Sequence, residues 1–287
     1  MNPANLTLDF LVNDAVVYSL PLLHDRLNQA INHPRSSITD IIRIISEDAG
    51  LSSRILRLAN SPMFGFHSDI DSIGKAVTII GTRQLHDLAM AVSVMGVFKD
   101  IPEGVISMTS FWQHSITCGI IARILATYRR ESNVERFFVT GMLHDIGQLI
   151  LCVKVPGLVR EMIVASRDSG IAYFAVQRSV LGFDHGAVGG ELLKRWKIPA
   201  IITEPVGCHH APGRAELYPM ETSLIHVADV IAHTMQVGFV GEPFVPPMDQ
   251  RSWERLSIPI SLLATIMDRA DAQLGEAMAI LSGDAPS

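Results

Sequence analysis

The stretch Phe137–Leu151, FFVTGMLHDIGQLIL, joins a run of apolar residues to two adjacent ionisable side chains. The apolar residues predict a buried helix that ends at His144 and Asp145. Burying such a pair without partners costs several kcal/mol, so the folded chain must supply partners. Two interpretations stay open. His144 either satisfies the last carbonyl groups of a helix that Gly147 terminates, or it forms a pair of metal ligands with Asp145.

The remaining sequence also has the pattern of a helical protein. Aromatic residues make up only 6% of the chain, and alternating runs of β-branched residues are scarce. Asp48 and Ser72 are predicted to cap two short helices, and Thr82 a longer helix that ends near Phe98. We therefore expect an all-α fold made of two apposed helical bundles, with short helices before about residue 100 and longer ones after it.

Two segments that contain proline and glycine, Asp100–Ser107 and Gly238–Pro247, predict domain boundaries. They divide the chain into three parts. Residues 1–103 form the bundle of short helices, residues 104–237 carry most of the suggestive histidines, and residues 238–287 form a linker followed by a C-terminal helix.

Composition excludes several classes of protein. With 48% hydrophobic and 18% charged residues and a net charge of −6, the chain is neither disordered nor a coat for polyanions. Its longest nearly apolar stretch, Leu88–Phe98, has 11 residues, whereas a membrane-spanning helix needs about 20. No basic residue precedes Arg26, so we see no signal peptide and expect a cytoplasmic protein without a membrane partner.

Ionisable residues recur in apolar surroundings between Trp112 and Asp229. Each has an ordinary explanation of its own: a buried histidine with one hydrogen bond, a surface turn, a solvated helix end, or a carboxylate paired with a base. Their origin in successive helices of one half of the chain favours a shared metal site. Imidazole and carboxylate without thiolate suit iron, manganese, zinc or nickel, as one or two ions. The candidate ligands are His114, His144, Asp145, His185, His209, His210 and Asp229.

Asp145 has a special place in this set, because a carboxylate can bridge two ions. A pair of metal ions activates water and clamps a phosphoryl group. If the chain is an enzyme, we therefore expect Asp145 to be its catalytic carboxylate.

The order H…HD…D, read on His114, His144, Asp145 and Asp229, resembles the HD superfamily of metal-dependent phosphohydrolases. From about Leu20 to about Thr234 the chain resembles the HD-related output domain, HDOD. The motifs that carry this resemblance are ISEDAGLSSRILRLANSPMFG (45–65), DSIGKAVTIIGTRQLHDLA (71–89), FWQHS (111–115), GMLHDIGQLIL (141–151), LGFDHGAVGGELLKRWKIP (181–199) and CHH (208–210).

The resemblance implies a second bundle with an HD-domain-like helical core and a regulatory role in bacterial two-component or cyclic-dinucleotide signalling. Many HDOD members have lost the metal ligands, but here all the ligand positions are occupied. The related HD-GYP phosphodiesterases carry a lysine in HDIGK, where this chain has Gln148, and their GYP element is absent after His210. Loss of a phosphate-binding cation removes charge stabilisation, so metal binding is better supported than catalysis.

Two functions stay open. One is a non-catalytic signalling module that binds metal or a small ligand and acts in trans on a response regulator, a kinase or a cyclic-dinucleotide enzyme. The other is a metal-dependent phosphohydrolase for a nucleotide or cyclic dinucleotide. In it, His114, His144, Asp145 and Asp229 hold one ion, and His185, His209 and His210 hold a second ion that Asp145 bridges.

A nucleic-acid partner is disfavoured. Two predicted helices around Gly81 imitate a helix-turn-helix. The cations from Asp71 to Phe98 are Lys75 and Arg83, opposed by Asp71 and Asp87, which provides no electrostatic attraction for phosphates.

Overall fold

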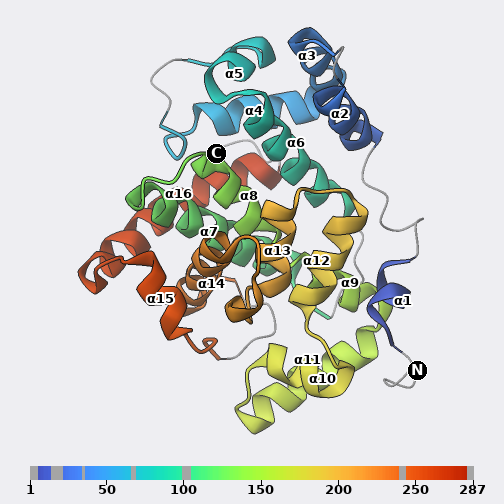
Figure 1. Ribbon diagram of the computed structural model, residues 1–287, viewed down its shortest axis with the longest axis vertical. Coiled ribbons are helices and arrows are strands. Elements are labelled where there is room, and N and C mark those ends of the chain that lie inside the picture. The colour runs from blue at the N-terminus through green and yellow to red at the C-terminus, as the bar shows by residue number, and fades with distance from the viewer. Residues whose placement is uncertain are drawn as a thin grey trace. The chain divides into compact units, whose positions relative to one another are not determined.

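The computed structural model describes residues 6–13, 22–33, 36–65, 69–98, 105–238 and 244–282. Every regular element in these ranges is a helix, and no β-strand occurs in them (Figure 1). The all-α fold predicted from the sequence is thus confirmed. The two predicted boundary segments lie partly outside the described residues, at 100–104 and 239–243.

The chain forms two compact units, and each unit is built from two separate segments. Unit 1 contains Met1–Tyr18 and Asp100–Ala270, and unit 2 contains Ser19–Lys99 and Asp271–Ser287. Unit 2 therefore combines early helices with the end of the chain. The division into three consecutive domains stays a prediction.

Local caps set the ends of the short helices in unit 2. Asp48 and Ser72 each accept a hydrogen bond from the backbone N–H three residues on, as predicted. The prediction for Thr82 is wrong, because Gly81, with a φ of +95°, both ends one helix and precedes the next. Gly81 occupies the N-cap position of the second helix, and a glycine has no side chain that could cap it. The helices are α2 (Leu22–Asn32), α3 (Ile38–Ser46), α4 (Ala49–Asn60), α5 (Ile73–Ile80), α6 (Thr82–Val97) and the C-terminal part of α16 (Leu263–Ser282).

Unit 1 holds the candidate ligands. The expectation of longer helices after about residue 100 is wrong as a general rule, because α8 (Val134–Leu143) has 10 residues and α9 (Ile146–Lys154) has 9, whereas α6 has 16. In unit 1, α7 packs against α8 and α14, while α12 packs against α9 and α13. Its α-helices are α1 (Leu8–Val12), α7 (Met108–Tyr128), α8 (Val134–Leu143), α9 (Ile146–Lys154), α10 (Pro156–Ser169), α11 (Tyr173–Leu181), α12 (His185–Arg195), α13 (Ala200–Cys208), α14 (Pro219–Thr234), α15 (Gln250–Leu256) and the start of α16. Two 3₁₀ turns, η2 (Pro212–Arg214) and η3 (Ile260–Leu262), complete it.

Glycines allow the helices of unit 1 to approach closely. A Cβ atom on Gly141 would lie 2.7 Å from the Cα of Gly119, at the contact between α8 and α7. A Cβ atom on Gly147 would lie 2.0 Å from the backbone oxygen of His185, at the contact between α9 and α12. No larger residue fits at these distances without a shift of the backbone. The close packing brings the ends of α8, α9 and α12 near enough for their side chains to meet.

The segment that forms α8 and α9 is strongly apolar. By length and composition alone, Val134–Lys154 could cross a membrane, but 89% of its apolar window is buried inside the protein. The segment consists of two helices, α8 and α9, and apolar helices buried in this way are typical of a protein core.

Candidate metal centre

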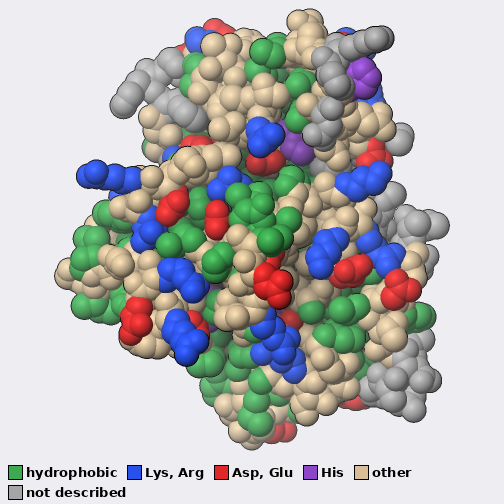
Figure 2. All heavy atoms as spheres, viewed as in Figure 1, with side chains coloured by type: hydrophobic (Ala, Val, Ile, Leu, Met, Phe, Trp, Pro, Cys, Tyr) green, Lys and Arg blue, Asp and Glu red, His purple; other side chains and the backbone are tan. Residues whose placement is uncertain are grey.

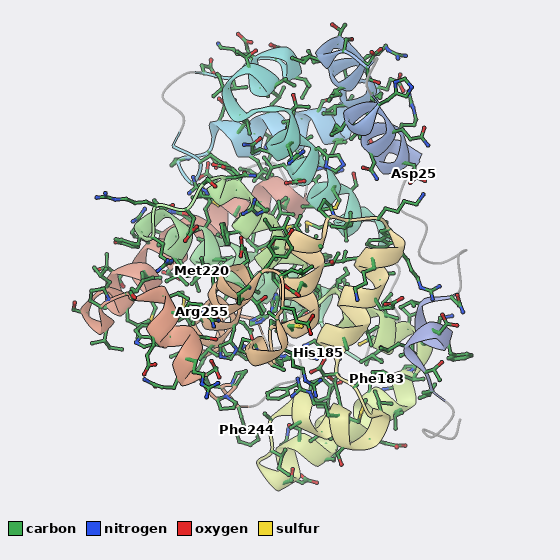
Figure 3. The ribbon with its side chains drawn as sticks, in the orientation of Figure 1. Asp25, Phe183, His185, Met220, Phe244 and Arg255 are labelled. Carbon is green, nitrogen blue, oxygen red and sulfur yellow. The ribbon has the colours of Figure 1, made fainter. Side chains whose placement is uncertain are left out.

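The structure brings all seven predicted ligands together inside unit 1. They come from five places in the fold: α7, the α8–α9 junction, the start of α12, the end of α13, and α14. Figure 3 shows His185 at the first turn of α12, among side chains of the neighbouring helices. The ligands form two groups, His114 with His144 and Asp229, and Asp145 with His185, His209 and His210.

The pair His144 and Asp145 lies between two helices. His144 is the C-cap of α8, and α9 begins at Ile146, directly after Asp145. Gly147 is therefore the second residue of α9 and does not terminate the preceding helix.

The first group surrounds a carboxylate oxygen of Asp229. Its Oδ1 lies 3.2 Å from Nε2 of His114 and 3.3 Å from Nε2 of His144. Both histidines are fully buried, as is Asp229. Two imidazole nitrogens and one carboxylate oxygen that lie this close together are suited to binding a transition-metal ion.

The second group surrounds Asp145 in the same manner. Oδ1 of Asp145 lies 3.0 Å from Nε2 of His185 and 3.6 Å from Nε2 of His209. Nε2 of His210 lies 3.0 Å from Nε2 of His185. Two such nitrogens cannot both carry a proton toward each other, so at least one presents a lone pair.

Asp145 also reaches the first group. Its Oδ1 lies 3.2 Å from Nε2 of His144, and its Oδ2 lies 3.7 Å from Nε2 of His114. Asp145 thus lies within 3.7 Å of two histidines of each group, whereas Asp229 reaches the second group at Nδ1 of His210, over 3.9 Å. Asp145 therefore has the position expected of a bridging ligand.

Backbone carbonyl groups orient two of the histidines. Nδ1 of His144 lies 2.6 Å from the oxygen of Gly141, and Nδ1 of His209 lies 2.7 Å from the oxygen of Val206. A carbonyl oxygen only accepts, so each Nδ1 carries a proton and each Nε2 faces the centre. This is a common way of preparing imidazole for a metal ion.

Three buried atoms support the fit of a cation. Nε2 of His144, Nε2 of His209 and Oδ2 of Asp229 have no hydrogen-bond partner among the described residues. Buried polar atoms normally have partners, because leaving one unsatisfied costs about 1–3 kcal/mol. A bound ion would satisfy all three, so these residues fit a metal ion.

The charge of the two carboxylates is balanced by imidazoles. Burial opposes ionisation of Asp145, but His144 and His185 outweigh burial and hold its pKa well below the usual value. Burial likewise opposes ionisation of Asp229, and its pKa is held well below the usual value chiefly by His233. Both carboxylates are anions at neutral pH.

The surroundings lower the pKa of three of these histidines and raise the pKa of a fourth. Burial lowers the pKa of His209 to about 4, and burial also lowers the pKa of His114 and His210. Burial opposes the charge on His144 as well, but the Asp145 carboxylate raises its pKa well above the usual value. Neutral imidazole is the form that binds a metal ion, so most of the set is ready for one.

His226 and His233 lie on the same helix as Asp229, three residues before it and four residues after it. We call His233 an outer partner, which means a residue that contacts predicted ligands without being one of the seven. Its Nδ1 lies 3.0 Å from Oδ1 of Asp229, and its ring packs edge-on against His114. His226 does not contact the carboxylates in this way. Its Nδ1 lies 2.8 Å from the oxygen of His209, and its Nε2 accepts from the N–H of Asp249.

Two further residues of the site were not predicted. The ring of Phe174 stacks on His210, with centroids 4.3 Å apart. Oε1 of Gln177 lies 2.7 Å from Nδ1 of His185. Both residues belong to α11, and no local pattern in the sequence marks them, because their role depends on how α11 packs.

A cavity of about 320 Å³ reaches the second group from outside, with His210 in its wall. Phe174, Arg214 and two prolines, Pro246 and Pro247, also line it. The lining also holds the carboxylate of Asp249, so an aromatic ring, one cation, one anion and apolar walls make this cavity suited to a small polar ligand.

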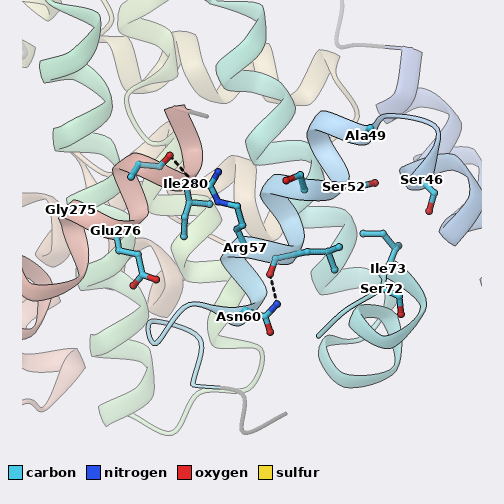
Figure 4. Close-up of a pocket in the computed structure, with 13 residues that line it drawn as sticks. Ser46, Ala49, Ser52, Arg57, Asn60, Ser72, Ile73, Gly275, Glu276 and Ile280 are labelled. Carbon is cyan, nitrogen blue, oxygen red and sulfur yellow. Dashed lines mark hydrogen bonds between the residues drawn. The ribbon is translucent and has the colours of Figure 1, made fainter. Parts of the chain in front are cut away.

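A larger cavity, of about 1150 Å³, lies in unit 2 between α4 and the end of α16 (Figure 4). Arg57 crosses it and donates to the backbone oxygen of Ala279, while Asn60 donates to the oxygen of Leu56. The ionisable residues in its lining are Arg57 and Glu276, so the described lining offers no cluster of metal ligands.

Solved structures share this fold. A protein of Shewanella amazonensis SB2B, provisionally named a phosphohydrolase, has a TM-score of 0.70 and 23% identity, and the match covers 96% of this chain and 98% of that one. An HDOD domain protein with unknown function from Geobacter sulfurreducens has a TM-score of 0.70 and 22% identity, with coverage of 95% and 96%. A second Shewanella amazonensis SB2B protein, provisionally named a metal-dependent phosphohydrolase, has a TM-score of 0.64 and 22% identity, with coverage of 96% of each chain. At these identities the likeness concerns the fold.

An uncharacterized protein of Treponema pallidum (strain Nichols) is 24% identical to this chain over 250 residues, which are 86% of the chain. The chain spans 45% of the length of that relative. The family model of the HDOD domain matches residues 17–212, which is more than half of the chain. The chain therefore belongs to the HDOD domain family.

Proposed function

We propose that this chain is a regulatory module of bacterial signal transduction, and that unit 1 holds one or two metal ions as a structural or sensory element. The observation that carries the proposal is that seven ionisable side chains gather in two adjoining groups in the interior of unit 1. Three buried polar atoms without hydrogen-bond partners among the described residues destabilise the folded chain unless a ligand binds them.

The donor set supports iron, manganese, zinc or nickel, because these ions accept imidazole and carboxylate together. His114, His144 and Asp229 would hold one ion, and His185, His209 and His210 would hold the other. Asp145 would bridge the two. A metal pair lowers the pKa of a bound water toward neutrality and neutralises phosphoryl charge.

Burial favours a regulatory role over turnover. The side chain of Asp145, the most exposed carboxylate of the set, is only 8% exposed, and Asp229 is fully buried. Every ion-pair partner of these two carboxylates among the described residues is a histidine. No lysine or arginine in that part of the chain joins the cluster to stabilise a phosphoryl group.

A signalling protein acting in trans is the proposed partner: a response regulator, a kinase or a cyclic-dinucleotide enzyme. A nucleotide is the proposed small ligand, because the cavity beside His210 offers Arg214 for an anionic group. On the face drawn in Figure 2, basic and acidic side chains are interspersed. This distribution does not favour nucleic acid, which binds to clustered basic residues.

A metal-dependent phosphohydrolase is the second candidate. Two observations favour it: Asp145 contacts both groups of histidines, and a cavity reaches the second group at His210. Its substrate would be a nucleotide or a cyclic dinucleotide.

One experiment separates the two candidates. The full chain is expressed with added iron, manganese or zinc, and its metal content is measured together with the hydrolysis of cyclic dinucleotides and of bis(p-nitrophenyl) phosphate. We expect bound metal without turnover. Hydrolysis that Asp145→Ala abolishes would replace the regulatory proposal by the enzyme, and metal content below one ion per chain would count against both metal-based proposals.

A further inference from the structure

A chain of buried hydrogen bonds leads away from the second group of ligands. Gln177 contacts His185, Gln148 contacts Gln177, and Tyr173 contacts Gln148. The three distances are 2.7, 2.9 and 3.0 Å, respectively. The four residues are at most 3% exposed, so water does not compete for these bonds.

A backbone group determines the direction of the first bond. The N–H of His185 donates to Oε1 of Gln177 over 3.0 Å, and a backbone N–H can only donate. The atom it meets must therefore be the amide oxygen. Nδ1 of His185 lies 2.7 Å from the same oxygen and must also donate, so Nδ1 carries a proton.

The other bonds follow the same direction. With its oxygen facing His185, Gln177 presents Nε2 to Oε1 of Gln148. Gln148 then presents its own Nε2 to the hydroxyl of Tyr173, at 3.0 Å, and to Sγ of Cys152, at 3.7 Å. Neither amide has an alternative orientation that keeps all of these bonds.

We propose that Gln177 and Gln148 are positioning residues that place a proton of His185 on Nδ1 and turn its Nε2 toward the metal site that it shares with Asp145, and that Tyr173 completes this relay. The inference rests on the metal-binding function proposed above and adds to it the means by which the second group is tuned. Hydrogen bonds from outer residues orient ligating histidines and raise their basicity.

The relay also gives Gln148 a role that a lysine cannot fill. Lysine only donates, so in place of Gln148 it would face Nε2 of Gln177 with no acceptor. The side-chain amide of Gln177 would have to flip to accept from the lysine. Its oxygen would then no longer accept the hydrogen bond from the backbone N–H of His185. In this chain, glutamines at 148 and 177 are therefore required together.

The test uses the full chain labelled with ¹⁵N-histidine, with zinc as the metal probe. Two-dimensional ¹H–¹⁵N NMR of the metal-free protein should show a protected proton on Nδ1 of His185. Gln177→Met, which is close in shape and cannot accept that proton, should abolish the signal. It should also weaken zinc binding by about 10- to 100-fold in competition with a chromophoric chelator.

Variants further along the relay extend the test. Gln148→Met and Gln148→Lys should both weaken zinc binding, the lysine variant more strongly, and Tyr173→Phe should have the smallest effect. Gln250→Met is the matched control, because Gln250 lies exposed in α15 and donates to Glu254. We expect the control to behave as wild type in both measurements.

Three results would overturn the inference: an unprotonated Nδ1 on His185 in the wild-type protein, an unchanged NMR signal in Gln177→Met, or improved zinc binding in Gln148→Lys. The first measurement needs no variant and no metal. If the wild-type protein binds no zinc but Nδ1 is protonated as described, the metal proposal fails while the relay stands.

Discussion

His144 and Asp145 are neighbours in the sequence, but they flank two different helices, and their Nε2 and Oδ1 atoms lie 3.2 Å apart. Successive residues of an uninterrupted helix point about 100° apart. The break between α8 and α9 removes this restriction, so both side chains reach the same centre. The short junction thereby supplies one ligand to each group.

Asp145→Ala should abolish metal binding in both groups. Asp145 contacts histidines of each group, so its loss removes a shared ligand. We expect a loss of zinc affinity greater than the roughly 10- to 100-fold that is typical for an outer partner. Isothermal titration with zinc, checked by elemental analysis, measures the effect.

Asp184→Asn is the matched control for that variant. Asp184 is a buried aspartate beside His185, but it caps α12 and pairs with Arg178, without facing the centre. Asparagine is as good a helix cap as aspartate, so zinc affinity should be retained. Equal losses in the two variants would show that Asp145 is not a ligand.

His233→Phe should weaken the first group selectively. Nδ1 of His233 lies 3.0 Å from Oδ1 of Asp229, and phenylalanine preserves the ring contact with His114 but not that partner. We expect a loss of about 10- to 100-fold in the affinity for one ion, with the other unchanged. His233→Gln, which retains a donor, should recover part of the loss in the same titration, and no recovery would contradict an outer-partner role.

Removal of metal should destabilise unit 1. A ligand present at 100 times its Kd stabilises the folded state by about 2.7 kcal/mol. The midpoint of thermal unfolding should therefore fall on treatment with a strong chelator and return when zinc is added. Asp145→Ala should show no such response, and a wild-type midpoint that ignores both treatments would count against a bound ion.

The ligand residues could be predicted because their local surroundings are unusual. His144 and Asp145 follow a run of apolar residues, and Asp229 stands within LIHVADVI, where an ionisable side chain demands a partner. The resemblance to known motifs added the order of the ligands. The assignment of all seven as metal ligands stays a prediction, while their convergence is a property of the fold.

The outer residues could not be predicted for the opposite reason. Gln177 and Phe174 occupy an ordinary amphipathic helix, in which glutamine is typical of a solvated face. Their contacts with His185 and His210 join different helices. Such contacts depend on long-range packing, which the spacing of residues along α11 does not encode.

Gly147→Ala should disturb both the packing and the centre. Its new Cβ would lie 2.0 Å from the backbone oxygen of His185, so α9 and α12 must separate. Overpacking of this kind costs about 1–3 kcal/mol, measured as the free energy of unfolding in urea. Because the shift moves Asp145 away from His185, zinc affinity should fall as well.

Gly157→Ala tests whether that loss comes from the contact or from the loss of glycine itself. Gly157 is the second residue of α10, as Gly147 is of α9, but a Cβ there meets no atom within 4 Å. Alanine at an unobstructed helical position should stabilise the protein by about 0.4–1 kcal/mol and leave zinc affinity unchanged. If the two variants unfold alike, close contact between α9 and α12 does not hold the centre together. If Gly147→Ala destabilises the protein and Gly157→Ala stabilises it, the absence of a side chain at Gly147 is what allows Asp145 and His185 to meet.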